Sequence, residues 1–122
     1  MKSILIIDDE PEFLSMLKLR LMKTGFEIHE AANGHEGLEL LKGGLNPDLI
    51  ITDEMMPVMD GYRLVKTVKE DKRFSRIPII ILTAKETMKE AFEFVDVDCF
   101  MSKPFDPQEL IDQIRSLLEK TD

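Results

Sequence analysis

Five side chains that could carry chemistry stand at the ends of short apolar segments. Asp8 and Asp9 follow the first segment, and Asp53 follows the third. Thr83 and Lys103 come after the fourth and fifth segments. If these segments are parallel strands of one sheet, their carboxyl ends share an edge and the three carboxylates meet in a shallow pocket. Because carboxylates that meet in one pocket repel each other, the sequence predicts a bound hard cation, the Lys103 ammonium, or both at this edge.

An acidic group of this kind limits the choice of metal. Oxygen ligands at a solvent-facing rim favour Mg²⁺, which keeps several waters and needs only one or two carboxylates. Neither His29 nor His35 joins the acidic group in the sequence, which argues against zinc. A carboxylate beside Mg²⁺ and a lysine can attack a phosphoryl group and become an aspartyl phosphate. The Thr83 hydroxyl is suited to hydrogen-bond a phosphoryl oxygen at the neighbouring strand end.

The elements that would position these residues alternate regularly along the chain. Short runs rich in β-branched residues are typical of parallel strands that are covered on both faces. The predicted strands are Ser3–Ile7, Phe26–Glu30, Leu49–Thr52, Ile79–Leu82 and Val97–Met101. Amphipathic segments separate them, so we expect an α/β fold with right-handed crossovers and helices on both faces of the sheet.

Helical spacing of apolar residues predicts five helices, one after each strand. Pro11, Asn33 and Asp106 are suited to the starts of the first, second and fifth helices, and Gly25 to the end of the first. The apolar positions, helix by helix, are Phe13, Leu17 and Leu21; Leu38, Leu41 and Leu45; Leu64, Val65 and Val68; Met88, Ala91, Phe92 and Val95; and Leu110, Ile114, Leu117 and Leu118.

Composition bounds the class of protein. The chain has 122 residues, which fits one domain over residues 1–122 with a sizeable core. With 24 acidic and 16 basic residues its net charge is −8, which argues against binding nucleic acid or an anionic membrane. The single cysteine, Cys99, excludes an intramolecular disulfide and fits a reducing compartment. Because a signal peptide and a membrane-length apolar run are absent, we expect a cytoplasmic location.

Four short motifs occur in order at the ends of the predicted strands. They are Asp8-Asp9, Asp53-Glu54-Met55-Met56-Pro57, Thr83-Ala84 and Lys103-Pro104-Phe105. Together they resemble the signatures of the CheY-like receiver domain of bacterial two-component response regulators, and the resemblance covers essentially the whole chain. It implies a flavodoxin-like (βα)5 fold, in which a doubly wound five-stranded parallel sheet has the strand order 2-1-3-4-5.

The resemblance also implies the phosphoacceptor and the metal ligands. Asp53 would accept a phosphoryl group from the phosphohistidine of a sensor histidine kinase or a phosphotransfer domain. Asp9, Asp53 and the backbone carbonyl of Met55 would bind Mg²⁺, and Asp8 would hold the metal directly or through water. The domain would not be a conventional enzyme, although it would assist its own phosphorylation and dephosphorylation.

The remaining roles that the resemblance implies concern the phosphoryl group and the signal. Thr83 and Lys103 would bind the phosphoryl group, and a cis bond between Lys103 and Pro104 would aim the lysine inward. Phe100 stands in the place of an aromatic switch residue, whose ring would be more buried after phosphorylation. The changed surface would then engage a downstream output protein or domain, in a stand-alone regulator or in a longer protein.

Two departures from the family pattern fall in one segment. Asp96-Val97 stands where the family usually has a Gly-Ala pair, and the segment from Thr83 to Lys103 is slightly shorter than usual. Both departures affect the expected fourth helix and its signalling surface rather than the pocket.

Each key residue also has a structural explanation when it is taken alone. The acidic pair could begin a helix, Thr83 could satisfy backbone groups, and Phe100 and Cys99 could fill the core. An FMN-binding module would need a Gly-rich or hydroxyl-rich phosphate loop where acidic residues stand, and no P-loop motif is present. A degenerate receiver that binds proteins without phosphorylation is the second alternative, against which the intact pocket argues.

Overall fold

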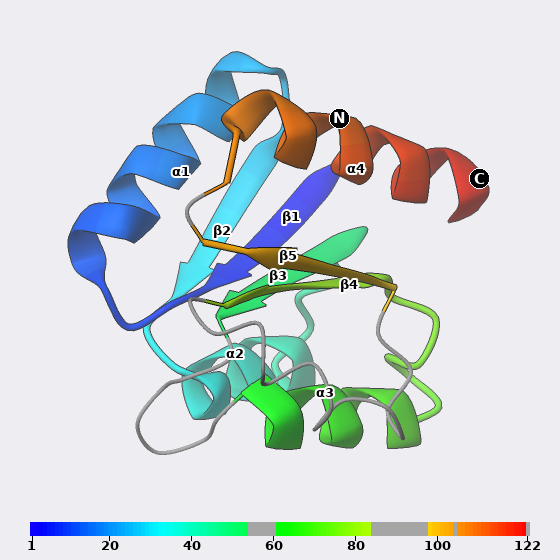
Figure 1. Cartoon of the computed structure of the whole chain (residues 1–122). Helices are drawn as coiled ribbons and strands as arrows, with labels where there is room; N and C mark the ends of the chain where they lie inside the picture. The colour runs from blue at the N-terminus through cyan, green and yellow to red at the C-terminus, as the bar shows by residue number, and fades with distance from the viewer. Residues whose placement is uncertain (54–60, 84–97, 104, 122) are drawn as a thin grey trace.

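A computed structural model, described for residues 1–53, 61–83, 98–103 and 105–121, contains one parallel sheet between two layers of helices (Figure 1). In chain order the elements are β1 (Ser3–Ile7), α1 (Pro11–Lys23), β2 (Glu27–Ala31), α2 (Gly34–Lys42), β3 (Leu49–Asp53), α3 (Gly61–Glu70), β4 (Ile79–Thr83), β5 (Cys99–Ser102) and α4 (Pro107–Thr121). The sheet order is β2-β1-β3-β4-β5 with every pair parallel. The predicted fold class and strand order are therefore confirmed.

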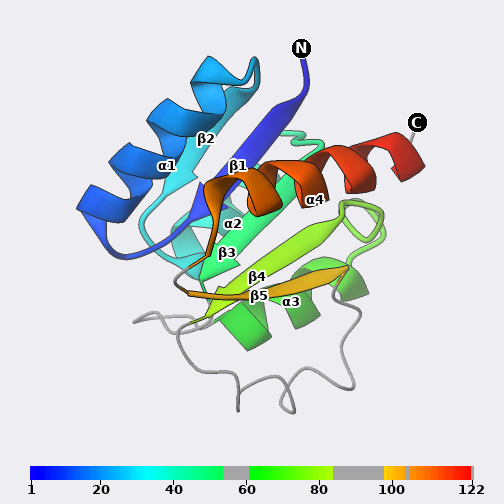
Figure 2. The same cartoon turned by 45° about the horizontal axis from the view of Figure 1, so that its top comes forward.

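The sheet separates two apolar layers. Figures 1 and 2 show α1 and α4 on one face and α2 and α3 on the other. Ile4 and Ile6 of β1 pack toward α1 and α4, whereas Leu5 and Ile7 pack toward α2 and α3. Successive strand residues point to opposite faces, so a strand buried on both faces is apolar throughout. This double burial explains why the continuous apolar runs predicted the central strands.

The strand limits differ from the predicted ones by small amounts that matter at the site. Both β3 and β4 extend one residue further than predicted, so that Asp53 and Thr83 are the last residues of their strands. At the sheet edge β2 begins at Glu27, one residue after Phe26. The first described residue of the fifth strand is Cys99, and the predicted start at Val97 lies outside the described residues.

Two of the predicted helix starts are confirmed by their capping hydrogen bonds. The side chain of Asn33 accepts a hydrogen bond from the backbone N–H of Glu36 at 2.8 Å. Asp106 accepts one from the backbone N–H of Gln108 at 2.9 Å. Each bond satisfies a donor that the first turn of a helix would otherwise leave without a partner.

The apolar stripes of α1 and α2 differ from the prediction. Leu14, Leu17 and Leu21 form the buried face of α1, whereas Phe13 is only partly buried. Because Leu14 continues the spacing as well as Phe13 does, tertiary packing decides between them. The second helix ends at Lys42, so Leu45 lies beyond it, after Gly44 with a φ of 114°. At such an angle a side chain is strained, which favours glycine.

Two further points concern helices. The residues expected to form a fourth helix, from Met88 to Val95, lie outside the described residues. None of the helices that the structure describes has both the length and the apolar character needed to cross a bilayer.

Candidate functional site

The structure brings Asp8, Asp53 and Lys103 together at the carboxyl edge of the sheet. Asp8 follows β1, Asp53 ends the neighbouring β3, and Lys103 follows β5. The two carboxylates are buried, with Asp8 only 1% and Asp53 8% exposed. Asp9 lies on the exposed rim beside them. A parallel α/β sheet offers ligands a site at this edge, where adjacent connections leave toward opposite faces.

Lys103 links the two buried carboxylates. Its Nζ lies 3.0 Å from Asp8 Oδ2 and 3.5 Å from Asp53 Oδ1. Burial alone lowers the pKa of Lys103, but the hydrogen bond to Asp8 and the charges of Asp53 and Asp8 outweigh burial and raise the pKa above its ordinary value. The lysine is therefore a cation at neutral pH, shared between two anions.

Backbone contacts fix the orientation of Asp8. Its Oδ1 accepts a hydrogen bond from the backbone N–H of Glu10 at 3.0 Å, while Oδ2 faces Lys103. The backbone N–H of Asp8 donates to the carbonyl of Ala31 at 3.1 Å. A carboxylate held on both oxygens is already oriented before any ligand enters.

Phe13 packs partly buried against the core, as its spacing predicts, and it also contacts Lys103, which the sequence did not indicate. Lys103 Nζ lies 4.2 Å from the centre of the Phe13 ring, a cation–π contact. Phe105 meets the same ring edge-to-face, with centroids 6.1 Å apart. The useful sequence signal was its position: an aromatic residue in the first turn of the helix that follows the acidic pair.

A second group of carboxylates could hold a metal. Among the described residues, ligand oxygens of Asp8, Asp9 and Glu10 all lie within 4.8 Å of one another. An all-oxygen set that includes a buried carboxylate fits a hard cation such as Mg²⁺. Sequence reasoning did not assign Glu10 as a ligand, although it directly follows the acidic pair. Asp53 connects to this group through the Lys103 ammonium.

An open cavity of about 340 Å³ adjoins this acidic group on the side of β2. Four acidic side chains, Asp8, Asp9, Glu30 and Glu36, line it, together with Pro11, Leu14, Ser15, Ala31 and Ala32. The negative lining disfavours a free anionic ligand unless a cation accompanies it.

The structure places the remaining predicted residues less completely. Thr83 ends β4 opposite Ser102 of β5, at the same edge as Asp53. Phe100 is partly buried and packs against the apolar layer of α2 and α3. The predicted ligand Met55 and the predicted cis bond at Pro104 fall outside the described residues.

Comparison with known proteins identifies the family. The model of the family described as "response regulator receiver domain" matches residues 4–115 of the chain. The chain belongs to this family. The receiver domain is 35% identical, over its full length, to the DNA-binding dual master transcriptional regulator RpaA of Synechocystis, of which it covers 51%. It is 42% identical to the transcriptional regulatory protein SrrA of Staphylococcus aureus over 97% of the chain and 48% of that protein. The receiver domain thus spans about half the length of these curated relatives.

Solved structures agree with this assignment. The signal receiver domain of a signal transduction histidine kinase from Syntrophus aciditrophicus has a TM-score of 0.91 and 33% identity, over 98% of this chain and 92% of that one. The response regulator TrrA of Thermotoga maritima, solved in complex with Mg²⁺-BeF, has a TM-score of 0.87 and 34% identity, over 96% and 99% of the two chains. The predicted resemblance to receiver domains is confirmed.

Proposed function

We propose that this receiver domain takes a phosphoryl group onto Asp53 from a histidine kinase phosphohistidine or a phosphotransfer domain, with Mg²⁺. The observation that carries the proposal is the position of Asp53. Asp53 is a residue with 8% exposure at the end of a central strand, and its Oδ1 lies 3.5 Å from the Lys103 ammonium. A carboxylate held at the end of a strand beside a cation is suited to nucleophilic attack on phosphorus.

The residues around Asp53 divide the work of the transfer. An Asp53 oxygen forms a bond to phosphorus while the bond from phosphorus to the histidine nitrogen breaks and the imidazole leaves. The Lys103 ammonium faces the charge that develops on the phosphoryl oxygens. Asp8 holds that ammonium at 3.0 Å, and the Phe13 ring lies 4.2 Å from it. Thr83, at the neighbouring strand end, would hydrogen-bond a phosphoryl oxygen.

The acidic donors fit the divalent ion that this proposal requires. Asp8, Asp9 and Asp53 would hold Mg²⁺, with the backbone carbonyl of Met55, and Glu10 is near enough to Asp9 to contribute. The bound ion would supply positive charge that offsets the carboxylates and the phosphoryl oxygens. The Mg²⁺-BeF complex of TrrA supports this part of the proposal.

In this proposal, phosphorylation changes the surface that the domain offers to an output partner. The domain then acts as a switch that assists its own phosphorylation and later its dephosphorylation. Thr83 and Phe100 would transmit the change to an output protein or domain. Similarity to transcriptional regulators supports an output in transcription. The site that would change on phosphorylation lies at one edge of the sheet, and Phe100 lies on the edge strand next to β4.

Labelling with acetyl phosphate and Mg²⁺ tests the phosphoacceptor. Intact mass should show one added phosphoryl group in wild type and in Asp112→Asn, which changes an exposed aspartate of α4. Asp53→Asn should remain unlabelled, and removal of Mg²⁺ with EDTA should abolish labelling of wild type. Equal labelling of wild type and Asp53→Asn would reject the assignment of Asp53, whereas absence of labelling in wild type would favour a degenerate receiver that binds partners without phosphorylation.

A further inference from the structure

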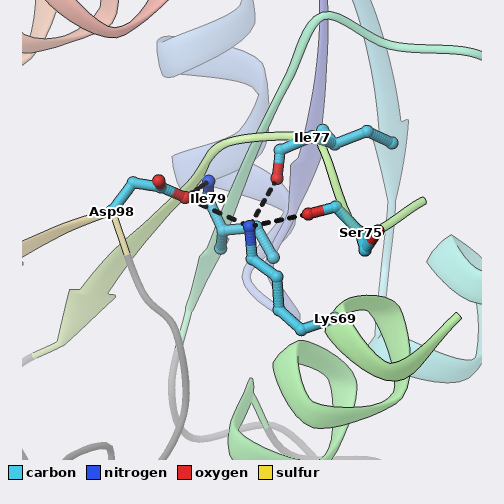
Figure 3. Close-up of polar contacts among 5 residues, drawn as sticks. All are labelled: Lys69, Ser75, Ile77, Ile79 and Asp98. Atoms are coloured by element: carbon cyan, nitrogen blue, oxygen red, sulfur yellow. Dashed lines mark hydrogen bonds and ion pairs between the residues drawn. The ribbon is translucent and has the colours of Figure 1, made fainter. Parts of the chain in front are cut away.

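A polar cluster lies at the opposite, amino-terminal edge of the sheet, where β4 and β5 begin. Lys69 of α3 reaches this edge with a side chain that is only 12% exposed. Figure 3 shows its ammonium between two backbone carbonyls and a carboxylate. The Nζ atom lies 2.9 Å from Ile77 O, 3.4 Å from Ser75 O and 3.3 Å from Asp98 Oδ2. An ammonium has three N–H donors, and three acceptors match them here.

Asp98 forms two hydrogen bonds with Ile79, the first residue of β4. Its backbone N–H donates to the carbonyl of Ile79 at 3.2 Å, and its Oδ2 accepts the backbone N–H of the same residue at 2.8 Å. Asp98 stands directly before β5, so it continues the pairing of Cys99 with Ile80 by one residue. Lys69 binds the same carboxylate oxygen and ties it to α3 and to the loop before β4.

The same two-point contact occurs at the start of β3. The backbone N–H of Asp48 donates to Ser3 O at 2.8 Å, and Asp48 Oδ2 accepts the N–H of Ser3 at 2.8 Å. However, β3 pairs with both β1 and β4, whereas β5 is an edge strand that pairs with β4 alone. Its four residues are only partly buried. The register of β5 therefore depends more on its starting contact than that of β3 does.

The register of β5 decides where Lys103 lies. A slip of one residue would move Lys103 about 3.3 Å along the strand and turn the β5 side chains to the opposite face. A movement of that size is as long as the 3.0 Å contact between Lys103 and Asp8. Phe100 would leave the apolar layer of α2 and α3 by the same slip.

We propose that Lys69 and Asp98 form a register clamp on β5 that positions Lys103 in the site at the other edge of the sheet. In this role Lys69 and Asp98 are positioning residues, since neither touches the reacting carboxylate. The consequence for phosphorylation rests on the proposed function of Asp53, whereas the effect on the position of Lys103 does not.

The reactivity of Cys99 can report whether the clamp is open or closed. Cys99 is the only cysteine of the sequence and stands next to Asp98. The Cys99 residue itself is partly buried. Burial is the largest effect on the Cys99 thiol and raises its pKa; a backbone hydrogen bond opposes this increase, and the charge of Asp98 adds to it by the smallest amount. We therefore expect alkylation of the folded protein to be slow and opening of the strand start to accelerate it.

The first measurement is the rate of Cys99 alkylation by iodoacetamide at low urea. Lys69→Met should increase that rate about tenfold through local opening, with little dependence on urea. Losing a cation does not favour the thiolate, so a faster reaction reports opening rather than altered thiol chemistry. Lys66→Met, which changes an exposed lysine of the same helix, should match wild type. If the rate increases only in proportion to global unfolding, the local clamp is rejected.

The second measurement follows Lys103 by NMR, through its side-chain Cε signal in protein without Mg²⁺. Lys69→Met should displace this signal and slow acetyl phosphate labelling about tenfold under conditions where the variant stays folded. Should that variant fail to fold, Asp98→Asn keeps an acceptor for the Ile79 N–H but removes the charge. Its Lys103 signal should move in the same direction.

The outcomes separate this proposal from the proposed function. An unchanged Lys103 signal in a folded clamp variant would overturn the positioning role, even if the variant is less stable. Absence of labelling in wild type would reject phosphorylation of Asp53, while Cys99 alkylation and the Lys103 signal would still decide whether the clamp exists.

Discussion

Lys69 and Lys103 lie at opposite ends of β5, with side chains that are 12% and 17% exposed. Their partners differ although their burial is similar. Lys69 faces one carboxylate, that of Asp98, and two backbone carbonyls. Lys103 faces the two carboxylates of Asp8 and Asp53. Among the described residues, one carboxylate faces the first ammonium and two carboxylates face the second.

We interpret this difference as one between a structural lysine and the lysine of the proposed phosphorylation site. A cation that is paired with one carboxylate and fully hydrogen-bonded has no further partner to recruit, so its effect is on the stability and geometry of the fold. The site around Lys103 is made still more negative by Asp9 and Glu10, whose oxygens gather around Asp8. We expect such a site to be less stable alone and to be stabilised by a bound cation, as the proposed function requires.

The largest expected effect is that of Lys103→Met on phosphorylation. Loss of one donor that faces developing charge slows transfer by about 10²–10³-fold in comparable sites. Acetyl phosphate labelling followed by intact mass measures the rate. Lys18→Met is the matched control, because Lys18 forms an exposed pair with Glu30 at 3.4 Å. A fall no larger than that of the control would show that Asp53 reacts without the ammonium.

The second effect is stabilisation by Mg²⁺. Binding only to the folded state at 100 times the dissociation constant adds about 2.7 kcal/mol to the free energy of unfolding. Thermal unfolding with and without Mg²⁺ measures the shift. Asp9→Asn should reduce the shift while leaving the metal-free protein as stable as wild type or more so, since one repelling charge is gone. Equal Mg²⁺ titrations of the two proteins would exclude Asp9 as a ligand.

The third effect is a loss of unfolding free energy in Lys69→Met. Breaking a buried ion pair costs about 3–5 kcal/mol, and exposure of Asp98 brings the expected loss for Lys69→Met nearer to about 2 kcal/mol. Urea unfolding measures this value. Lys18→Met should cost under about 1 kcal/mol, because surface pairs contribute little. Similar losses in the two variants would remove the contrast between a clamp and a surface pair.

The central part of the fold was predictable because burial on both faces makes a strand apolar at every position. Motifs at the strand ends then predicted that Asp8, Asp53 and Lys103 meet, as the structure confirms. Helical spacing allows either Phe13 or Leu14 to continue toward Leu17; Phe13 does pack against the core, partly buried, but Leu14 is the buried residue. Only the packing of α1 against the sheet and the position of Lys103 distinguish the two.

The contacts of Lys69 and Asp98 could not be predicted from the sequence. Lys69 and Asp98 are 29 residues apart, and neither belongs to a motif or an apolar stripe. An aspartate directly before a strand is also a common turn residue, so Asp48 and Asp98 look alike in sequence. The contacts with Ser3 and Ile79 depend on strand pairing, which local periodicity does not encode.

The smallest effect is a pH dependence that should separate Lys103 from the other lysines. Its pKa is raised in the folded state, so its ion pairs stabilise the protein fully below the unfolded lysine pKa of about 10.4. This contribution is lost as pH rises through the higher folded pKa. The difference in unfolding free energy between wild type and Lys103→Met should therefore be constant near neutrality and should narrow in alkaline solution. Lys18→Met controls for titration of exposed lysines. A difference that is flat into the alkaline range would mean that the two carboxylates do not stabilise the ammonium in the folded protein.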